Sequence, residues 1–216
     1  MEIETITARQ IMPPMGLIIG GPKVGKSTFC STIPDALIID LEGNGYDHIG
    51  AESIVRPKTH KEVLEVFKFY FESDKFKMLV VDHARELTNH FSSQIAKEAG
   101  VKMIDQIGFG KGTNELRHDV YSFLKKLRTR ASENKRVILV AHSTDRNGQV
   151  RLDVDGKLDT MITGMVDYIG QIYRAGPENY VNFTSQTGSE SGCRNKNLAN
   201  YNGVANWSEI VKVANQ

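Results

Sequence analysis

Short apolar runs alternate along the chain with segments whose apolar side chains recur every three or four positions. The apolar runs are residues 17–20, 36–40, 77–82 and 136–141. The segments with helical periodicity or helix-start signals are residues 26–32, 59–72, about 86–99 and about 113–134. Uninterrupted apolar strands are typical of sheets buried on both faces. The alternation therefore predicts an α/β fold, with a mostly parallel central sheet flanked by helices.

The last third of the chain departs from this alternation. Residues 169–173 and 180–184 are strand candidates joined by a turn at 176–179, and Asn147-Gly148 is a second hairpin-type turn. We therefore expect a mixed sheet with a β-hairpin region near the C-terminus, followed by a short helix around 207–213. A single domain is predicted over residues 16–216, preceded by an N-terminal arm over residues 1–15.

The first apolar run leads directly into a glycine-rich phosphate-binding motif. Its pattern is G-x-x-x-x-G-K-S, and the residues predicted to bind the nucleotide are Gly20, Gly21, Pro22, Lys23, Val24, Gly25, Lys26, Ser27 and Thr28. Backbone N–H groups of such a loop can surround phosphate oxygens, Lys26 can reach the β- and γ-phosphates, and the Ser27 hydroxyl can ligate Mg²⁺. ATP and Mg²⁺ are the cofactors expected. The alternative is a glycine-rich turn that carries a lysine by chance.

Polar residues follow the other apolar runs, and the carboxyl ends of parallel strands meet at one edge of a sheet. Asp82 ends the run 77–82 and suits a Walker B aspartate that supports Mg²⁺, or else caps the next helix. Glu42 is a candidate general base, with Asp40 as its competitor. His142 could contact the γ-phosphate or be a satisfied core histidine.

The composition argues against a strongly basic, a disulfide-rich or a membrane-spanning protein, but it does not indicate a function. The chain has 216 residues, is 40% hydrophobic and 25% charged, and carries a formal charge of +1. These values suit a globular protein without a global basic field, so any nucleic-acid binding must come from a local patch. Cys30 and Cys193 fit reduced thiols, and no apolar run approaches the roughly 20 residues of a membrane span. The expected location is the cytoplasm, that of the host cell if the protein is phage-encoded.

Together the motifs resemble the RecA-type ATPase core, and in particular the short phage-encoded ATPases of DNA recombination and single-strand annealing. The resemblance covers about residues 16–200. The motifs that carry it are Gly21–Ser27, Ile38–Gly43, Leu79–Asp82, Val140–Ser143, and Gly108–Gly112 before a long helix. It implies an ATP-dependent protein that binds single-stranded DNA, with Glu42 as catalytic carboxylate, Asp82 as Walker B residue and His142 as γ-phosphate sensor.

The same resemblance implies rings or filaments in which ATP lies between subunits, and makes a single-strand DNA-binding protein a plausible partner. A neighbouring subunit would then supply basic residues to the γ-phosphate. Arg194 and Lys196 could be these basic residues if both point the same way from a strand; the alternative is that they form a solvated basic loop. The chain also departs from the family pattern. His83 stands where a small hydroxyl residue is common, and His142 stands where bacterial recombinases carry glutamine.

Two loops could hold DNA. The candidate DNA-binding residues are Lys102, Phe109, Lys111, Arg117, Arg146 and Arg151, in or beside the segments 100–112 and 143–151. Basic side chains with an interleaved aromatic suit single-stranded nucleic acid, although an ordinary mobile surface loop is an equal alternative. Two further functions stay open, a P-loop kinase for small molecules and a nucleotide-gated assembly module for DNA replication or packaging. Against the kinase, an extra strand is expected between the P-loop strand and Asp82.

Overall fold

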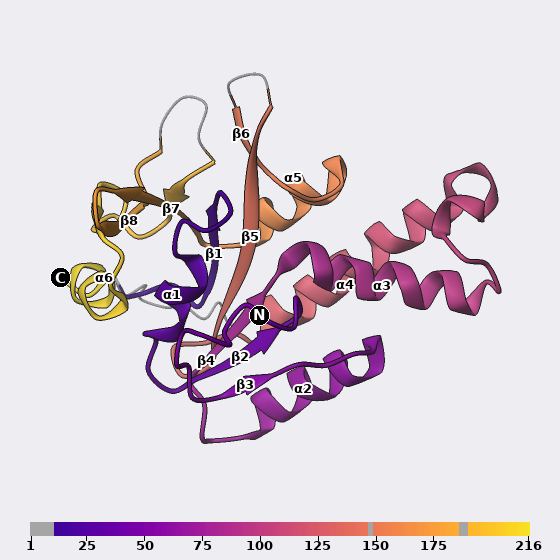
Figure 1. Cartoon of the computed structure of the whole chain (residues 1–216), viewed down its shortest axis with the longest axis horizontal. Coiled ribbons are helices and arrows are strands. Elements are labelled where there is room, and N and C mark those ends of the chain that lie inside the picture. Colours follow the sequence, from indigo (N-terminus) through magenta and orange to yellow (C-terminus); the bar gives the residue numbers. More distant parts are fainter. Residues whose placement is uncertain (1–10, 147–148, 186–189) are drawn as a thin grey trace, which may run out of the picture.

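A single mixed sheet organises the chain (Figure 1). The computed structural model describes residues 11–146, 149–185 and 190–216, apart from the side chains of Arg146 and Gln149. Its strands are β1 (Met15–Gly20), β2 (Ala36–Asp40), β3 (Ile54–Val55), β4 (Met78–Asp82), β5 (Arg136–Arg146), β6 (Gln149–Leu152), β7 (Tyr168–Ala175), β8 (Glu178–Asn182), β9 (Gly192–Cys193) and β10 (Asn202–Val204). Its α-helices are α1 (Lys26–Ser31), α2 (His60–Glu72), α3 (Ala84–Glu98), α4 (Lys111–Arg130), α5 (Gly156–Met165) and α6 (Trp207–Ala214).

The strand order is β10-β8-β7-β1-β5-β4-β2-β3. The pairs from β7 to β3 are parallel, whereas β7–β8, β8–β10, β5–β6 and β7–β9 are antiparallel. The predicted α/β fold, a mostly parallel sheet with a β-hairpin near the C-terminus, is confirmed. An extra strand was expected between the P-loop strand and Asp82, and the structure identifies it as β5, which lies between β1 and β4.

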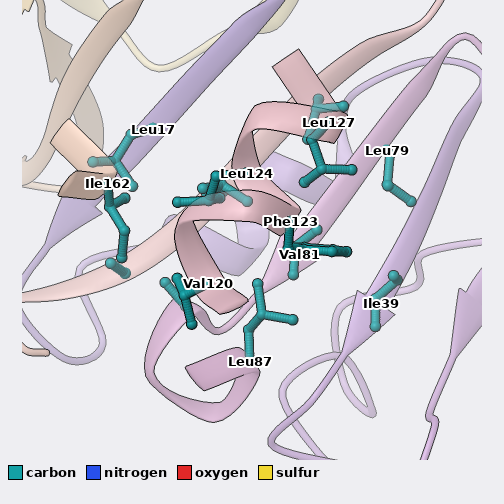
Figure 2. Packing of buried hydrophobic residues seen from close by; sticks show 14 of the residues in the cluster. Leu17, Ile39, Leu79, Val81, Leu87, Val120, Phe123, Leu124, Leu127 and Ile162 are labelled. Carbon is teal, nitrogen blue, oxygen red and sulfur yellow. The ribbon is translucent and has the colours of Figure 1, made fainter. Parts of the chain in front are cut away.

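Alternate residues of the central strands enter two separate cores, one on each face of the sheet. Leu17, Leu79 and Val81 pack with α3 and α4, as Figure 2 shows. Ile18 and Val80 point to the opposite face, which α1 and α6 cover. Burial on both faces explains why these strands have apolar residues at every position.

The segment between α3 and α4 is more regular than expected. It contains two 3₁₀ turns, Ile104–Gln106 and Gly108–Gly110, and α4 begins at Lys111 rather than near residue 113. A Cβ on Gly112 would lie 2.3 Å from the backbone oxygen of Ile104, so this glycine lets the start of α4 pack against the preceding turn. The helix ends at Arg130, short of the predicted 134, because Ala131 is extended. In Figure 1, α3 and α4 lie side by side and their connection forms the end of the pair farthest from the sheet.

Two further elements differ from the sequence prediction. Strand β5 continues past residue 141 to Arg146, because its polar second half pairs with β6 in a hairpin. The expected loop over 143–151 is therefore largely a β-ribbon, although the turn residues 147–148 lie outside the described part. Helix α5 was not predicted, since its glycines and threonines have low helix propensity.

The proposed boundary between an arm and a domain falls at a buried position. Met12 and Met15 are fully buried, and β1 begins at Met15. Residues 1–10 of the expected arm lie outside the described residues. Among the helices that the structure describes, none combines the length and apolar character needed to cross a membrane.

Leu124 provides a test of this packing, since it is about 1% exposed where α4 covers the sheet (Figure 2). We expect Leu124→Ala to lower the free energy of unfolding by about 2–5 kcal/mol, because it removes buried methyl groups and leaves a cavity. Chemical denaturation would measure the loss. Lys125→Ala, at the neighbouring exposed position, is the control, and equal stability of the two variants would contradict the assigned packing.

Candidate functional site

The P-loop joins the buried end of β1 to α1 and curves around the Lys26 side chain. Gly25 precedes α1 with φ 96°, in the left-handed region, and a Cβ there would lie 2.3 Å from the Asn179 side chain. The Lys26 Nζ donates to the carbonyl oxygens of Gly20 at 3.0 Å and Gly21 at 2.7 Å. Burial lowers the Lys26 pKa, and the nearby Asp82 and Glu42 carboxylates oppose that shift.

Asp82 lies at the end of β4, beside the P-loop, as predicted. Its Oδ2 accepts hydrogen bonds of 2.9 Å from both the Ser27 hydroxyl and the Tyr46 hydroxyl. Burial raises the Asp82 pKa, while the bonds from Tyr46 and Ser27 and the charge of Lys26 lower it. A hydroxyl and a carboxylate are hard oxygen ligands, so Ser27 and Asp82 fit a Mg²⁺ ion that also binds phosphates. Tyr46 was missed, because nothing in its sequence surroundings indicates that it reaches β4.

The two candidate carboxylates after β2 have different surroundings. Asp40 is buried, and it accepts a hydrogen bond of 3.0 Å from the Gly43 N–H and one of 2.9 Å from Arg56 Nε. Asp40 therefore holds the bend that follows β2. Glu42 extends from this bend toward the P-loop, with its Oε1 3.7 Å from His142 Nε2. This geometry favours Glu42 over Asp40 as the carboxylate that can meet a bound nucleotide.

His142 lies between Lys26 and Glu42. Its Nδ1 is 3.1 Å from Lys26 Nζ, and because an ammonium only donates, Nδ1 must accept. The hydrogen of a neutral His142 ring is then on Nε2, which faces Glu42. The side chain of His142 is partly exposed rather than enclosed in a core, so it can reach a ligand in the pocket.

A second histidine lies directly behind the first. His83 is 3% exposed, and its Nε2 accepts a hydrogen bond of 2.9 Å from the backbone N–H of His142. Burial, together with the nearby His142 and Lys26, lowers the His83 pKa to about 3. The sequence singled out His83 only as a departure from the family pattern, and it gave no sign of this contact.

These groups surround one pocket of about 430 Å³. Its lining residues are Pro22, Lys23, Gly25, Lys26, Ser27, Thr28, Glu42, Gly45, Ile49, Asp82 and His142. Gly20 and Gly21 contribute through their carbonyl oxygens, whereas Val24 packs against the apolar cluster under α1. A larger pocket of about 530 Å³ between α2 and α4 contains none of the predicted nucleotide-binding residues.

The candidate DNA-binding residues divide into groups. Lys102, Phe109 and Lys111 are exposed at the far end of the α3–α4 pair, and Phe109 is fully exposed with φ 56°. Arg117 instead lies near α5, 3.4 Å from the Asp155 carboxylate. Arg151 pairs with Glu190 at 2.9 Å. The side chain of Arg146 lies outside the described residues.

Arg194 and Lys196 are not on a strand, and this part of the prediction is wrong. Strand β9 ends at Cys193, and the two residues belong to the bend and turn that follow. The Arg194 guanidinium contacts Asp167 Oδ1 at 3.0 Å, and the Asp167 N–H donates to Met15 O. Met15 begins β1, so Arg194 lies at the opposite end of this strand from the P-loop of its own chain. Lys196 is exposed, and a role for either residue in a neighbouring subunit stays a prediction.

Comparison with known proteins places this geometry in a family. A family model described as AAA domain matches residues 12–197. The matched region includes the P-loop, Asp82, His142 and the segment after β9. No curated protein matches the chain.

The hydroxyl of Tyr46 tests the proposed metal site. Removing it in Tyr46→Phe takes away a hydrogen bond that lowers the Asp82 pKa, so that pKa rises further. Because Mg²⁺ needs the ionised carboxylate, Mg²⁺-dependent nucleotide binding is lost as pH falls through the Asp82 pKa. We expect this loss at a higher pH in Tyr46→Phe than in the wild type, measured by titrating Mg²⁺ against an ATP analogue at several pH values.

Tyr70→Phe is the matched control, because the Tyr70 hydroxyl contacts the carbonyl oxygens of Lys77 and Arg136 and, among the described residues, makes no hydrogen bond to Asp82. Coincident pH midpoints for Tyr46→Phe and the wild type would contradict a role for Tyr46 at the metal site.

Proposed function

The chain belongs to the AAA domain family of P-loop ATPases, and from this premise we propose that it is an ATP-dependent protein that binds single-stranded DNA and pairs or anneals strands. The observation that supports hydrolysis is that the His142 ring contacts Lys26 on one side and Glu42 on the other. Lys26 begins α1, Glu42 follows β2 and His142 lies within β5, and all three line the pocket with Ser27 and Asp82. The motif order in the sequence supports the DNA-linked role.

The residues of the pocket suit hydrolysis of a terminal phosphate. Lys26, now bonded to P-loop carbonyls, can turn its ammonium to the β- and γ-phosphate oxygens. Mg²⁺ held by Ser27 and Asp82 would neutralise phosphate charge. Glu42 can orient the attacking water and accept its proton, while His142 can donate from Nε2 to a γ-phosphate oxygen.

The end of the α3–α4 pair supports the DNA-binding part of the proposal. Phe109 is fully exposed at this end, and its φ of 56° is a left-handed backbone conformation that is uncommon for a residue other than glycine. Lys102 and Lys111 lie on either side of it in the sequence and are also exposed. An aromatic ring on which a base can stack, beside lysines for the phosphates, matches the needs of single-strand binding.

The assembly is also a proposal. Rings or filaments would place ATP between subunits, with Arg194 or Lys196 of a neighbour near the γ-phosphate, and a single-strand DNA-binding protein could deliver the substrate.

A small-molecule kinase is less well supported, because β5 lies between β1 and β4 as expected for the ATPase. The assembly module would show slow turnover that DNA leaves unchanged.

Replacing each carboxylate after β2 tests the catalytic assignment. We expect Glu42→Gln to bind ATP normally and to lower kcat by about 10²–10⁴-fold, since the amide cannot accept a proton from water. Asp40→Asn should lower the unfolding temperature by weakening the contacts with Gly43 and Arg56, while the folded protein still hydrolyses ATP. Single-turnover hydrolysis and thermal unfolding measure the two effects. The reverse pattern would assign the base to Asp40.

Phe109 tests the DNA-binding role. We expect single-stranded DNA to stimulate ATP turnover in the wild type, and Phe109→Ala to weaken DNA binding by about 1–3 kcal/mol through loss of base stacking. Turnover without DNA should not change. The assays are DNA titration at low salt and ATPase rate with and without DNA. Phe69→Ala, on an exposed phenylalanine of α2, is the matched control.

A wild-type protein that binds no single-stranded DNA with ATP and Mg²⁺ would overturn the proposed function. Equal DNA affinities for Phe109→Ala and Phe69→Ala would reject only the stacking residue.

A further inference from the structure

The contact between His83 and His142 joins the side chain of the residue that follows β4 to the backbone of β5. His83 Nε2 accepts the His142 N–H at 2.9 Å, and the two rings lie 4.4 Å apart with 46° between their planes. Strand β4 ends at Asp82, whose partner on β5 is Val140. His142 therefore lies beyond the last registered pair with β4, and the His83 imidazole supplies the acceptor for its backbone N–H. A buried N–H without an acceptor would be destabilising.

This hydrogen bond fixes the tautomer of His83. Because Nε2 uses its lone pair to accept, the hydrogen of the neutral ring is on Nδ1. Nδ1 is buried and contacts no hydrogen-bond partner among the described residues. The side chain of His83 does not line the nucleotide pocket. We therefore expect it to act on a bound nucleotide through His142.

The same tautomer argues against a metal site in this cluster. Glu42, His83 and His142 each offer a ligand atom, and these atoms lie within 4.8 Å of one another. A metal-bound imidazole needs a nitrogen lone pair directed at the ion and usually donates from the other nitrogen. In His83 the lone pair of Nε2 is already used, and Nδ1 carries the hydrogen. The histidine pair is therefore suited to hydrogen bonding rather than to ligating an ion.

We propose that His83 is a positioning residue for ATP hydrolysis, which holds the backbone of His142 so that the His142 ring stays between Lys26 and Glu42. The inference rests on the proposed function in one respect, the contact of His142 with the γ-phosphate. Without His83, the backbone at His142 loses an anchor, and a ring that must lie 3.1 Å from Lys26 and 3.7 Å from Glu42 moves out of position. Lys26 would lose its contact with His142, but its bonds to the Gly20 and Gly21 carbonyl oxygens do not involve either histidine, and we expect the P-loop to keep its shape.

The ratio of the affinities for a triphosphate and a diphosphate therefore tests whether His83 positions His142. ADP is held by the P-loop but has no γ-phosphate for His142 to contact. We expect His83→Leu to leave the ADP affinity within about twofold of the wild type, and to lower both kcat and the preference for a non-hydrolysable ATP analogue over ADP by at least about tenfold. His83→Gln should restore most of both, because its amide oxygen can reach the Nε2 position and accept the same bond.

Glu86→Gln is the matched control. Glu86 lies in the first turn of α3, and its Oε1 accepts a hydrogen bond of 3.1 Å from the Asn89 side chain. Neither Glu86 nor Asn89 lines the nucleotide pocket. This variant should keep the triphosphate preference and kcat. Calorimetric binding of the two nucleotides and single-turnover hydrolysis, all without DNA, give the measurements, so the result does not depend on whether the protein binds DNA.

Three results would overturn the proposal. One is an unchanged triphosphate preference and kcat in His83→Leu. Another is a loss of ADP affinity equal to the loss of ATP-analogue affinity, which indicates a merely structural role. If His83→Leu does not fold, His83→Gln is compared with His83→Asn, whose shorter side chain cannot reach the His142 N–H, and equal kcat values in that pair would also reject it.

Discussion

The parallel pairing of four strands that are buried on both faces is the constraint on which this site depends. In this register Gly20 is level with His142, and Asp82 is level with Asp40. The pairing brings to one edge groups that are more than a hundred residues apart in the sequence. Because a register shift of one residue would turn every side chain to the other face, the apolar pattern that stabilises the core also fixes the polar groups at the strand ends.

The site keeps ionisable groups buried, which is unfavourable unless other groups compensate. Lys26 is stabilised by two carbonyl oxygens and by the carboxylates of Asp82 and Glu42, whereas Asp82 is stabilised by the hydroxyls of Ser27 and Tyr46. A nucleotide with its metal ion would replace these contacts with stronger charge-assisted ones. The pocket is thus preorganised for an anionic ligand, and part of its stability in the free protein comes from contacts that ligand binding would exchange.

Several parts of this arrangement follow from short-range sequence patterns. The P-loop and the apolar strands that lead to Asp40, Asp82 and His142 could be predicted, because apolar runs and glycine spacing are local signals. The sequence could favour Glu42 over Asp40 as the catalytic carboxylate but could not decide between them, since both lie at the end of the same strand. The contacts of Tyr46 and His83 could not be predicted, because each depends on a bend or strand end meeting a distant segment.

The sequence by itself determined the α/β class, the phosphate-binding loop and the set of residues at the strand ends, since hydrophobic periodicity and loop chemistry are properties of neighbouring positions. Only the tertiary structure decided how those residues are used. It engaged Asp40 with Arg56, placed Arg194 against Asp167 away from the P-loop, and set His83 behind His142. Each of these contacts joins segments that come together through sheet register and loop path, and no local pattern in the sequence encodes either of them.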